Sequence, residues 1–253
     1  KEEFPGPKIR DAYSPPPGKI WYAIDYNQLE LRVFAADSEE HSLIQALDDG
    51  YDFHGFVSTQ IFNKPIEKIS KQERRIAKNT DFAIIFGAGE AKVNETAGIP
   101  GAYKMFAGLF PNVHTHMQKV IAEVRRDGFV RTMDGYRLAI PNEPYKAVNY
   151  RAQGTAGSII KNAMIAIDQE GLVDWIDSRI VLQSHDELII EFTKDSPKHT
   201  PAAVYAIMKA MEQAGAELGI NTPVSCERIE TDWGHGEEVK VTKTRITPIK
   251  KAA

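Results

Sequence analysis

Residues 179–192 constrain the fold more than any other part of the sequence. Apolar side chains alternate with polar ones on both sides of a polar turn, at Ile180 and Leu182 and then at Leu188, Ile190 and Phe192. Alternation with a period of two is typical of strands that bury one face, and residues 184–187 form a turn short enough for a hairpin. The sequence therefore predicts an antiparallel hairpin with two acids, Asp186 and Glu187, in its turn.

A third acid follows another apolar segment. Residues 21–24 are predicted to form a short buried strand, and Asp25 comes directly after them. Carboxylates at the ends of neighbouring strands can meet at one edge of a sheet, where they supply the oxygen ligands that Mg²⁺ prefers. A simpler interpretation stays open, and spacing alone favours it: Asp25 caps a helix and Asp186 is an ordinary turn residue.

The clearest helix start is the S-x-x-E pattern of Ser70 and Glu73, a capping box that opens a helix over about residues 71–86. Two cations and two aromatic rings recur along it at intervals of four and share one face: Arg74, Lys78, Phe82 and Phe86. Positive charge with flat rings suits a nucleoside triphosphate. The alternative is a solvated basic end that runs into a buried aromatic end.

The remaining segments predict a mixed α+β chain. Helices are expected over about residues 115–126 and from Gly154 to near Ile167, and the basic C-terminal tail, residues 240–251, is expected to be flexible. His114 and His116 would point apart on a helix, so they are interpreted as ordinary surface residues rather than metal ligands.

Composition narrows the class of protein. No run of apolar residues approaches the roughly 18 needed to span a membrane, and the single cysteine, Cys226, excludes an internal disulfide. The net charge of −4 is unusual for a protein that binds nucleic acid. Either the basic residues gather on one face, or the parts that hold a duplex lie outside this chain.

Several segments resemble motifs of the family A DNA polymerases, the bacterial DNA polymerase I family. In chain order they are residues 25–32 (DYNQLELR, similar to D-Y-S-Q-I-E-L-R), 52–54 (DFH, similar to D-I-H), 74–87 (similar to R-R-x-x-K-x-x-x-F-x-x-x-Y-G), 153–156 (QGTA) and 183–188 (QSHDEL, similar to Q-V-H-D-E-L). The resemblance runs from about residue 8 to residue 233.

The resemblance implies a fold and a division into subdomains. Residues 1–50 and 166–253 would form the palm, an antiparallel sheet with flanking helices that includes the catalytic hairpin 179–192 and the C-terminal tail. Residues 51–165 would form helical fingers, with the nucleotide-binding helix at about 71–86. The family's thumb and 3′–5′ exonuclease-like domain are not in this chain, so they are expected upstream in the natural polypeptide or in another chain.

The resemblance also implies catalytic and nucleotide-binding roles. Asp25, Asp186 and the backbone carbonyl of Tyr26 would hold two Mg²⁺ ions, with Mn²⁺ as a possible substitute, and Glu187 would be an accessory acid. The incoming dNTP would meet residues of the cationic helix and its surroundings: Lys78 (also catalytic), Arg74, Phe82, Phe86, His54, Gln28 and the steric gate Glu30.

Primer-template DNA would contact a further set of residues, namely Gln153, Asn149, His185, Arg137 and Thr155. The implied activity is DNA-templated DNA synthesis by two-metal nucleotidyl transfer, with release of pyrophosphate. The alternatives are a catalytically silent or incomplete nucleic-acid-binding fragment, a metal-dependent nuclease, and an RNA polymerase. A cytoplasmic setting is expected for a bacterial or phage protein, and an organellar one is possible for a eukaryotic protein.

Two departures from the family pattern affect the cationic helix. Phe86 replaces the usual Tyr, so a hydroxyl is lost. Asp81 replaces the usual Asn, which would add negative charge near the triphosphate unless its side chain points away.

Overall fold

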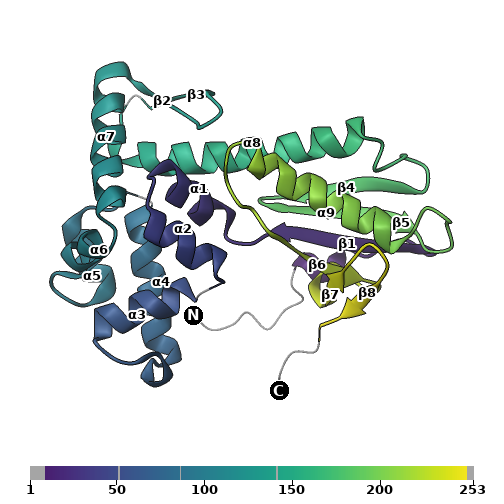
Figure 1. Cartoon of the computed structure of the whole chain (residues 1–253), viewed down its shortest axis with the longest axis horizontal. Coiled ribbons are helices and arrows are strands. Elements are labelled where there is room, and N and C mark those ends of the chain that lie inside the picture. Colours follow the sequence, from purple (N-terminus) through teal and green to yellow (C-terminus); the bar gives the residue numbers. More distant parts are fainter. Residues whose placement is uncertain (1–8, 51, 86, 141, 250–253) are drawn as a thin grey trace. The chain divides into compact units, whose positions relative to one another are not determined.

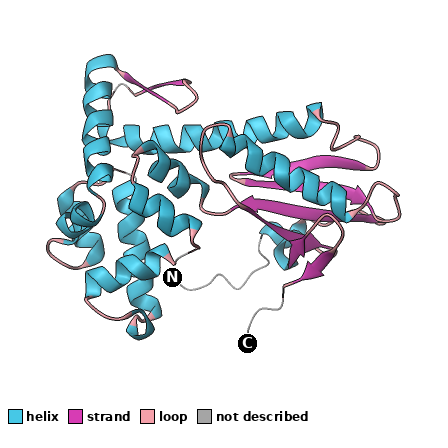
Figure 2. Cartoon of the chain, in the orientation of Figure 1, coloured by secondary structure: helices cyan, strands magenta, loops and turns pink. Residues whose placement is uncertain are grey.

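The computed structural model describes residues 9–50, 52–85, 87–140 and 142–249, which group into two units (Figure 1). The first unit contains the chain up to residue 29, residues 159–217 and the chain from residue 221 onward. The second contains residues 30–158 and 218–220. The strands of the larger sheet, drawn in magenta in Figure 2, belong to the first unit, whereas the second unit is mainly helical.

An antiparallel six-stranded sheet organises the first unit. Its spatial order is β4-β5-β1-β6-β7-β8, formed by β4 (Ser178–Ser184), β5 (Glu187–Thr193), β1 (Lys19–Tyr26), β6 (Val224–Ile229), β7 (Glu237–Val241) and β8 (Ile246–Pro248). The helix α9 (Pro201–Ala216) and two short 3-10 helices, η1 (Ile9–Ala12) and η4 (Trp233–His235), complete the unit together with the end of α8. β1 lies at the centre, between β5 and β6.

The two faces of β1 have different surroundings because successive side chains of a strand point to opposite sides. Tyr26 belongs to the even-numbered face and donates its hydroxyl hydrogen to the backbone oxygen of Met211 on α9, at 2.6 Å. On the odd-numbered face, Trp21 and Ala23 join a small apolar cluster with Trp233. Asp25 continues that odd-numbered face.

The second unit consists of helices and one small hairpin. In chain order these are α1 (Leu29–Asp37), α2 (His41–Asp48), α3 (Phe53–Phe62), η2 (Ile66–Lys68), α4 (Lys71–Ile85), α5 (Glu90–Ala97), α6 (Ala102–Leu109), α7 (Pro111–Asp127), β2 (Phe129–Arg131), β3 (Arg137–Ala139), η3 (Pro144–Lys146) and α8 (Ala147–Gln169), which continues into the first unit. Their apolar faces share one core that includes Phe34, Leu43, Phe53 and Met117.

Two predicted elements are confirmed. The hairpin of residues 179–192 is present as β4 and β5, with a bulge between Ile180 and Leu182. The predicted helix is α4, and its capping box is formed: the carboxylate of Glu73 accepts from the backbone nitrogen of Ser70 at 2.9 Å, and Ser70 Oγ accepts from the backbone nitrogen of Glu73 at 3.2 Å.

Several boundaries differ from the prediction. Asp25 does not cap a helix, because it lies within β1 and α1 begins only at Leu29. α7 begins at Pro111, and the tail that was expected to be flexible contributes β7 and β8.

The helix expected to follow Gly154 in fact begins at Ala147 and runs through that glycine. A Cβ atom on Gly154 would lie 2.7 Å from side-chain atoms of Thr132 and Leu138. The glycine is therefore explained by a close approach of the β2–β3 hairpin and does not mark a helix boundary.

The helical unit includes α1 and α2, which precede residue 50. The division of the chain into palm and fingers at about residues 50 and 165 therefore stays a prediction about the family's subdomains.

Candidate functional site

Three carboxylates converge at one end of the β1–β5 pair. Asp25, the penultimate residue of β1, is the register partner of Glu187, the first residue of β5, and Asp186 lies in the turn just before it. Directly opposed residues on neighbouring strands share a face of the sheet. The acids border a cavity of about 280 Å³, whose lining includes Asp25, Asp186, Glu187, His185, Arg10 and Glu227.

Burial and neighbouring charges raise the pKa values of Asp25 and Glu187. Burial, followed by the charges of Asp186 and Glu187, raises the pKa of Asp25 from its usual 3.8 to about 7. Burial also raises the pKa of Glu187, although Arg10 and Trp233 act in the opposite direction. Since the charges of Asp186 and Glu187 make ionisation of Asp25 less favourable, the site attracts cations.

Glu187 is anchored by two residues that the sequence analysis did not identify. Trp233 Nε1 donates to Glu187 Oε1 at 3.0 Å, and Arg10 lies 3.9 Å from Glu187 Oε2. The Arg10 guanidinium also stacks 4.3 Å from the centre of the Trp233 ring. Arg10 comes from the proline-rich start of the chain, where no periodicity could have indicated its position.

The turn between β4 and β5 has a left-handed residue at its tip. His185 has φ of 53°, and its backbone oxygen accepts from the side-chain amide of Gln183 at 2.7 Å. The side chain of His185 is exposed beside the three acids. The structure thus brings His185 together with Asp25, Asp186 and Glu187.

A second set of predicted residues gathers on α3 and α4. Arg74 donates to the carboxylate of Asp52 through Nε at 2.8 Å and through Nη2 at 2.6 Å. Asp52 also caps α3 by accepting from the backbone nitrogen of Gly55. Lys78 is exposed one helical turn after Arg74. Both cations act on His54, so these three predicted residues share one electrostatic environment.

Asp81 does not add an exposed negative charge to this surface. Its side chain has no exposed area, and its Oδ2 lies 2.8 Å from Nδ1 of His54. Burial raises its pKa well above the usual value. Desolvation and the charges of Lys78 and Arg74 lower the pKa of His54 to about 4.

The predicted DNA contacts lie in different environments. Gln153 is exposed on α8, and Asn149 is partly buried there. Arg137 on β3 is exposed, with its guanidinium 3.9 Å from the centre of the Phe129 ring. Thr155 is fully buried: its hydroxyl donates to the Arg151 backbone oxygen at 2.8 Å and accepts from the Met133 backbone nitrogen at 3.0 Å. These bonds join Thr155 to the interior of the helical unit, and its contact with DNA stays a prediction.

Three of the remaining predicted site residues lie where β1 ends and α1 begins. Gln28 is exposed with φ of 57°, between β1 and α1, and Glu30 lies in the first turn of α1, partly exposed. Tyr26 is buried at the end of β1. The side chain of Phe82 and the whole of Phe86 lie outside the described part of the chain.

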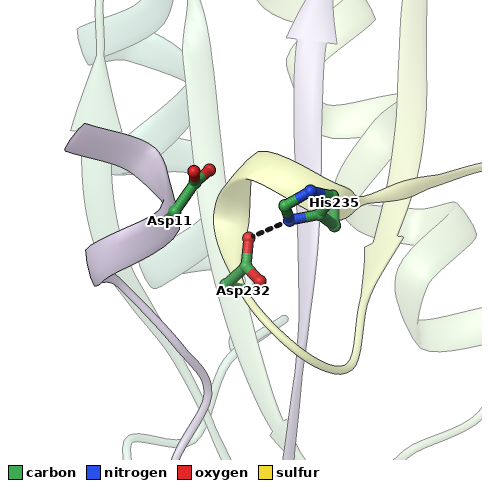
Figure 3. A group of neighbouring side chains, drawn as sticks. All are labelled: Asp11, Asp232 and His235. Carbon is green, nitrogen blue, oxygen red and sulfur yellow. Dashed lines mark hydrogen bonds and ion pairs between the residues drawn. The ribbon is translucent and has the colours of Figure 1, made fainter. Parts of the chain in front are cut away.

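Another group of possible metal ligands consists of Asp11, Asp232 and His235, whose ligand atoms all lie within 4.8 Å of one another (Figure 3). Asp232 Oδ1 accepts from the backbone nitrogen of Gly234 at 2.9 Å and from Nδ1 of His235 at 2.7 Å. These bonds cap η4 and explain the positions of Asp232 and His235, so we assign no metal to the group. Among the described residues, no other group of three or more possible ligands has its ligand atoms within 4.8 Å of one another. The ligand atoms of the three acids of the cavity are therefore farther apart than this.

Enzymes of phosphoryl transfer typically combine carboxylates that hold metal ions with cationic side chains that bind phosphate. This chain has a cavity bordered by carboxylates and a helix surface with two cations. The chain belongs to DNA polymerase family A, since the model of that family matches residues 2–235. None of the helices in the described ranges is long and apolar enough to cross a membrane.

Individual relatives support this assignment. The chain is 32% identical over 235 residues to DNA polymerase I of Pseudomonas aeruginosa, covering 87% of this chain and 26% of that protein. It is 29% identical over 249 residues to the thermostable DNA polymerase I of Thermus aquaticus, covering 92% of this chain and 29% of that protein. The chain thus spans about a quarter of the length of the curated relatives it matches.

A solved structure has the same fold. It is the POL domain of Pol1 from M. smegmatis in complex with DNA primer-template and dNTP, with a TM-score of 0.79 and 28% identity. The match covers 89% of this chain and 42% of that one.

Proposed function

We propose that this chain carries out DNA-templated DNA synthesis, transferring a nucleotide from a dNTP to the 3′-hydroxyl of a primer with release of pyrophosphate. The observation that carries the proposal is the convergence of Asp25, Asp186 and Glu187 on one cavity in a member of DNA polymerase family A. The M. smegmatis relative, whose structure is described with primer-template and dNTP, supports the same substrates.

The carboxylate cavity fits divalent metal. The pKa of Asp25 is raised to about 7 by burial and by its acidic neighbours, and a bound cation would favour the ionised form. Carboxylate and carbonyl oxygens are the ligands that Mg²⁺ prefers, and Mn²⁺ accepts the same ligands. Asp25, Asp186 and the backbone carbonyl of Tyr26 would hold two such ions, which when bound supply charge neutralisation at the attacking and leaving oxygens.

The chain's own residues would position the nucleotide. Lys78, Arg74 and His54 would bind the triphosphate, and Phe82 would stack on the incoming sugar and base. Arg74 is held by Asp52, so phosphate oxygens compete with that carboxylate for the guanidinium. Because in-line phosphoryl transfer depends on positioning and charge stabilisation, these contacts would account for much of the catalysis.

Selectivity and DNA binding involve other residues. Glu30 would exclude a ribose 2′-hydroxyl, with Gln28 nearby in the chain. Gln153, Asn149, His185 and Arg137 would contact the primer-template, whereas the buried Thr155 would hold Met133, which follows β2, against α8. A thumb and an exonuclease-like domain are proposed partners, in the same polypeptide or another.

Extension of a labelled primer tests the proposal. We expect Mg²⁺-dependent extension with dNTPs, loss of at least about 100-fold in rate for Asp186→Asn, and little change for Glu170→Gln, which alters an exposed acid of the same unit. With rNTPs in place of dNTPs we expect little extension, and Glu30→Ala should narrow that difference.

Each alternative predicts a different outcome. Shortening of the DNA in a metal-dependent reaction without dNTPs would identify a nuclease. Preferred use of rNTPs would identify an RNA polymerase. Binding of primer-template without extension, even at low salt and high protein concentration, would contradict the proposed activity for this chain and favour a silent or incomplete fragment.

A further inference from the structure

Asp81 on α4 and His54 on α3 form a largely buried pair inside the helical unit. Asp81 Oδ2 lies 2.8 Å from His54 Nδ1, Asp81 has no exposed side-chain area, and the side chain of His54 is 12% exposed. The other carboxyl oxygen of Asp81, Oδ1, is buried and has no hydrogen-bond partner among the described residues. The pair is therefore shielded from water.

Both members of the pair favour their neutral forms. An ionised carboxylate with one unsatisfied oxygen is costly to bury, and burial raises the pKa of Asp81. Burial, then the charges of Lys78 and Arg74, lowers the pKa of His54 to about 4, against a smaller opposing effect of Asp52. Lys78 and Arg74 lie on α4, and Asp52 is the N-cap residue of α3.

The neutral forms determine where the hydrogens lie. A protonated Asp81 donates its Oδ2–H to Nδ1 of His54. A neutral imidazole that accepts at Nδ1 carries its own hydrogen on Nε2.

We propose that Asp81 is a positioning residue, which as a neutral acid fixes the orientation of His54 and holds it in the tautomer with hydrogen on Nε2. The proposal rests on the proposed function, in which His54 contacts a nucleotide phosphate, and it identifies how His54 would do so. In this tautomer Nε2 meets a phosphate oxygen as a donor, whereas the opposite tautomer would present a lone pair to an anion.

The proposal also explains how an acid is tolerated beside a triphosphate site. A neutral Asp81 leaves the positive charge of the surface that carries Lys78 and Arg74 unchanged. It also makes the donor insensitive to pH in the neutral range, because an imidazole whose pKa is about 4 keeps the same protonation there.

Long-range ¹H–¹⁵N NMR of the ¹⁵N-labelled chain tests the tautomer directly, with His54→Gln used to assign the signal. We expect the Nε2–H form of His54, unchanged from about pH 8 to about pH 5.5. An Nδ1–H form, or an imidazole that becomes doubly protonated near its ordinary pKa of about 6.5, would overturn the proposal.

Substitutions at Asp81 test the positioning role through binding of inorganic tripolyphosphate. Asp81→Asn should keep the tautomer and bind within about twofold of the parent chain, because an amide can donate to Nδ1. Asp81→Leu should lose the defined tautomer and bind about fivefold more weakly, the effect of one hydrogen bond. Asp81→Ala is the second variant if the leucine prevents folding. Thr80→Val, which alters a buried hydroxyl on the same helix, should change neither readout.

The two readouts separate this proposal from the proposed function. If the parent chain shows the expected tautomer but does not bind tripolyphosphate, the assignment of α4 to nucleotide binding fails while the effect of Asp81 on His54 stands. If tripolyphosphate binds equally well after the tautomer is lost in Asp81→Leu or Asp81→Ala, the positioning role is wrong.

Discussion

The carboxylate of Asp37 is held between two basic side chains of the helical unit. Arg151 donates to it through Nε at 2.5 Å and through Nη2 at 2.6 Å, and His116 Nε2 lies 3.0 Å from it. Asp37 and His116 are largely buried, with side chains 8% and 12% exposed. The prediction that His116 is an ordinary surface residue is therefore wrong, since its partner, Asp37, is far away in the sequence.

Asp37→Asn should destabilise the chain in a pH-dependent way. Burial alone would raise the pKa of Asp37, but its contacts with His116 and Arg151 hold it below the usual 3.8. A lowered folded-state pKa stabilises the native protein above the unfolded-state value, and this contribution is lost as the pH falls through the folded-state pKa. We expect Asp37→Asn to lower the free energy of unfolding by about 3 kcal/mol at neutral pH.

Urea unfolding at several pH values checks this expectation. The difference between the parent chain and Asp37→Asn should be present above about pH 4 and shrink below it. Asp49→Asn, which alters an exposed carboxylate that accepts from Gln45, should have a small effect. A difference for Asp37→Asn that persists unchanged at low pH would contradict the linkage.

At the residue scale, the sequence correctly predicted which side chains lie together when those side chains belong to one local segment. Asp186 and Glu187 could be placed together because they adjoin one turn. Arg10 could not be predicted to contact Glu187, since an ion pair between distant segments leaves no periodic signal. The same applies to the pairing of Asp81 with His54, although both residues were noticed individually.

At the scale of elements, α4 depends on its N-terminal cap. Ser70→Ala removes the hydroxyl that accepts from the Glu73 backbone nitrogen, so we expect a loss of about 1 kcal/mol in the free energy of unfolding. Thr96→Ala is the control, because that hydroxyl only donates to the Lys92 backbone oxygen within α5. Urea unfolding measures both, and equal effects would argue against a specific capping contribution.

The elements that the sequence predicted best are those with local signals. The β4–β5 hairpin has a period of two and a polar turn, and α4 has a capping box. The tail was predicted poorly because its lysines and arginine suggest solvent exposure, whereas β7 is fixed by pairing with β6 and β8. The start of α8 was predicted too late in the sequence, after Gly154, because that glycine is needed for tertiary packing, which a single sequence does not reveal.

At the scale of the whole molecule, the acids and the cationic helix belong to different units. We therefore expect Asp186→Asn to abolish Mn²⁺ binding in the absence of nucleotide while tripolyphosphate affinity stays within about twofold. Lys78→Ala should do the reverse, lowering tripolyphosphate affinity about fivefold or more. Titration calorimetry measures both affinities. If either substitution impaired both affinities, the expectation that each unit binds its ligand independently would be wrong.

The register of β1 and β5 has a consequence for how this gene can change. Asp25 faces Glu187 because each residue along β1 has a fixed partner, from Lys19 opposite Thr193 onward. Inserting or deleting one codon within β1 would turn Asp25 to the opposite side of the sheet while leaving the number of ladder hydrogen bonds nearly unchanged. Lineages of this protein should therefore accumulate length variation in the connections between helices, and their sheet strands should tolerate substitutions but not indels.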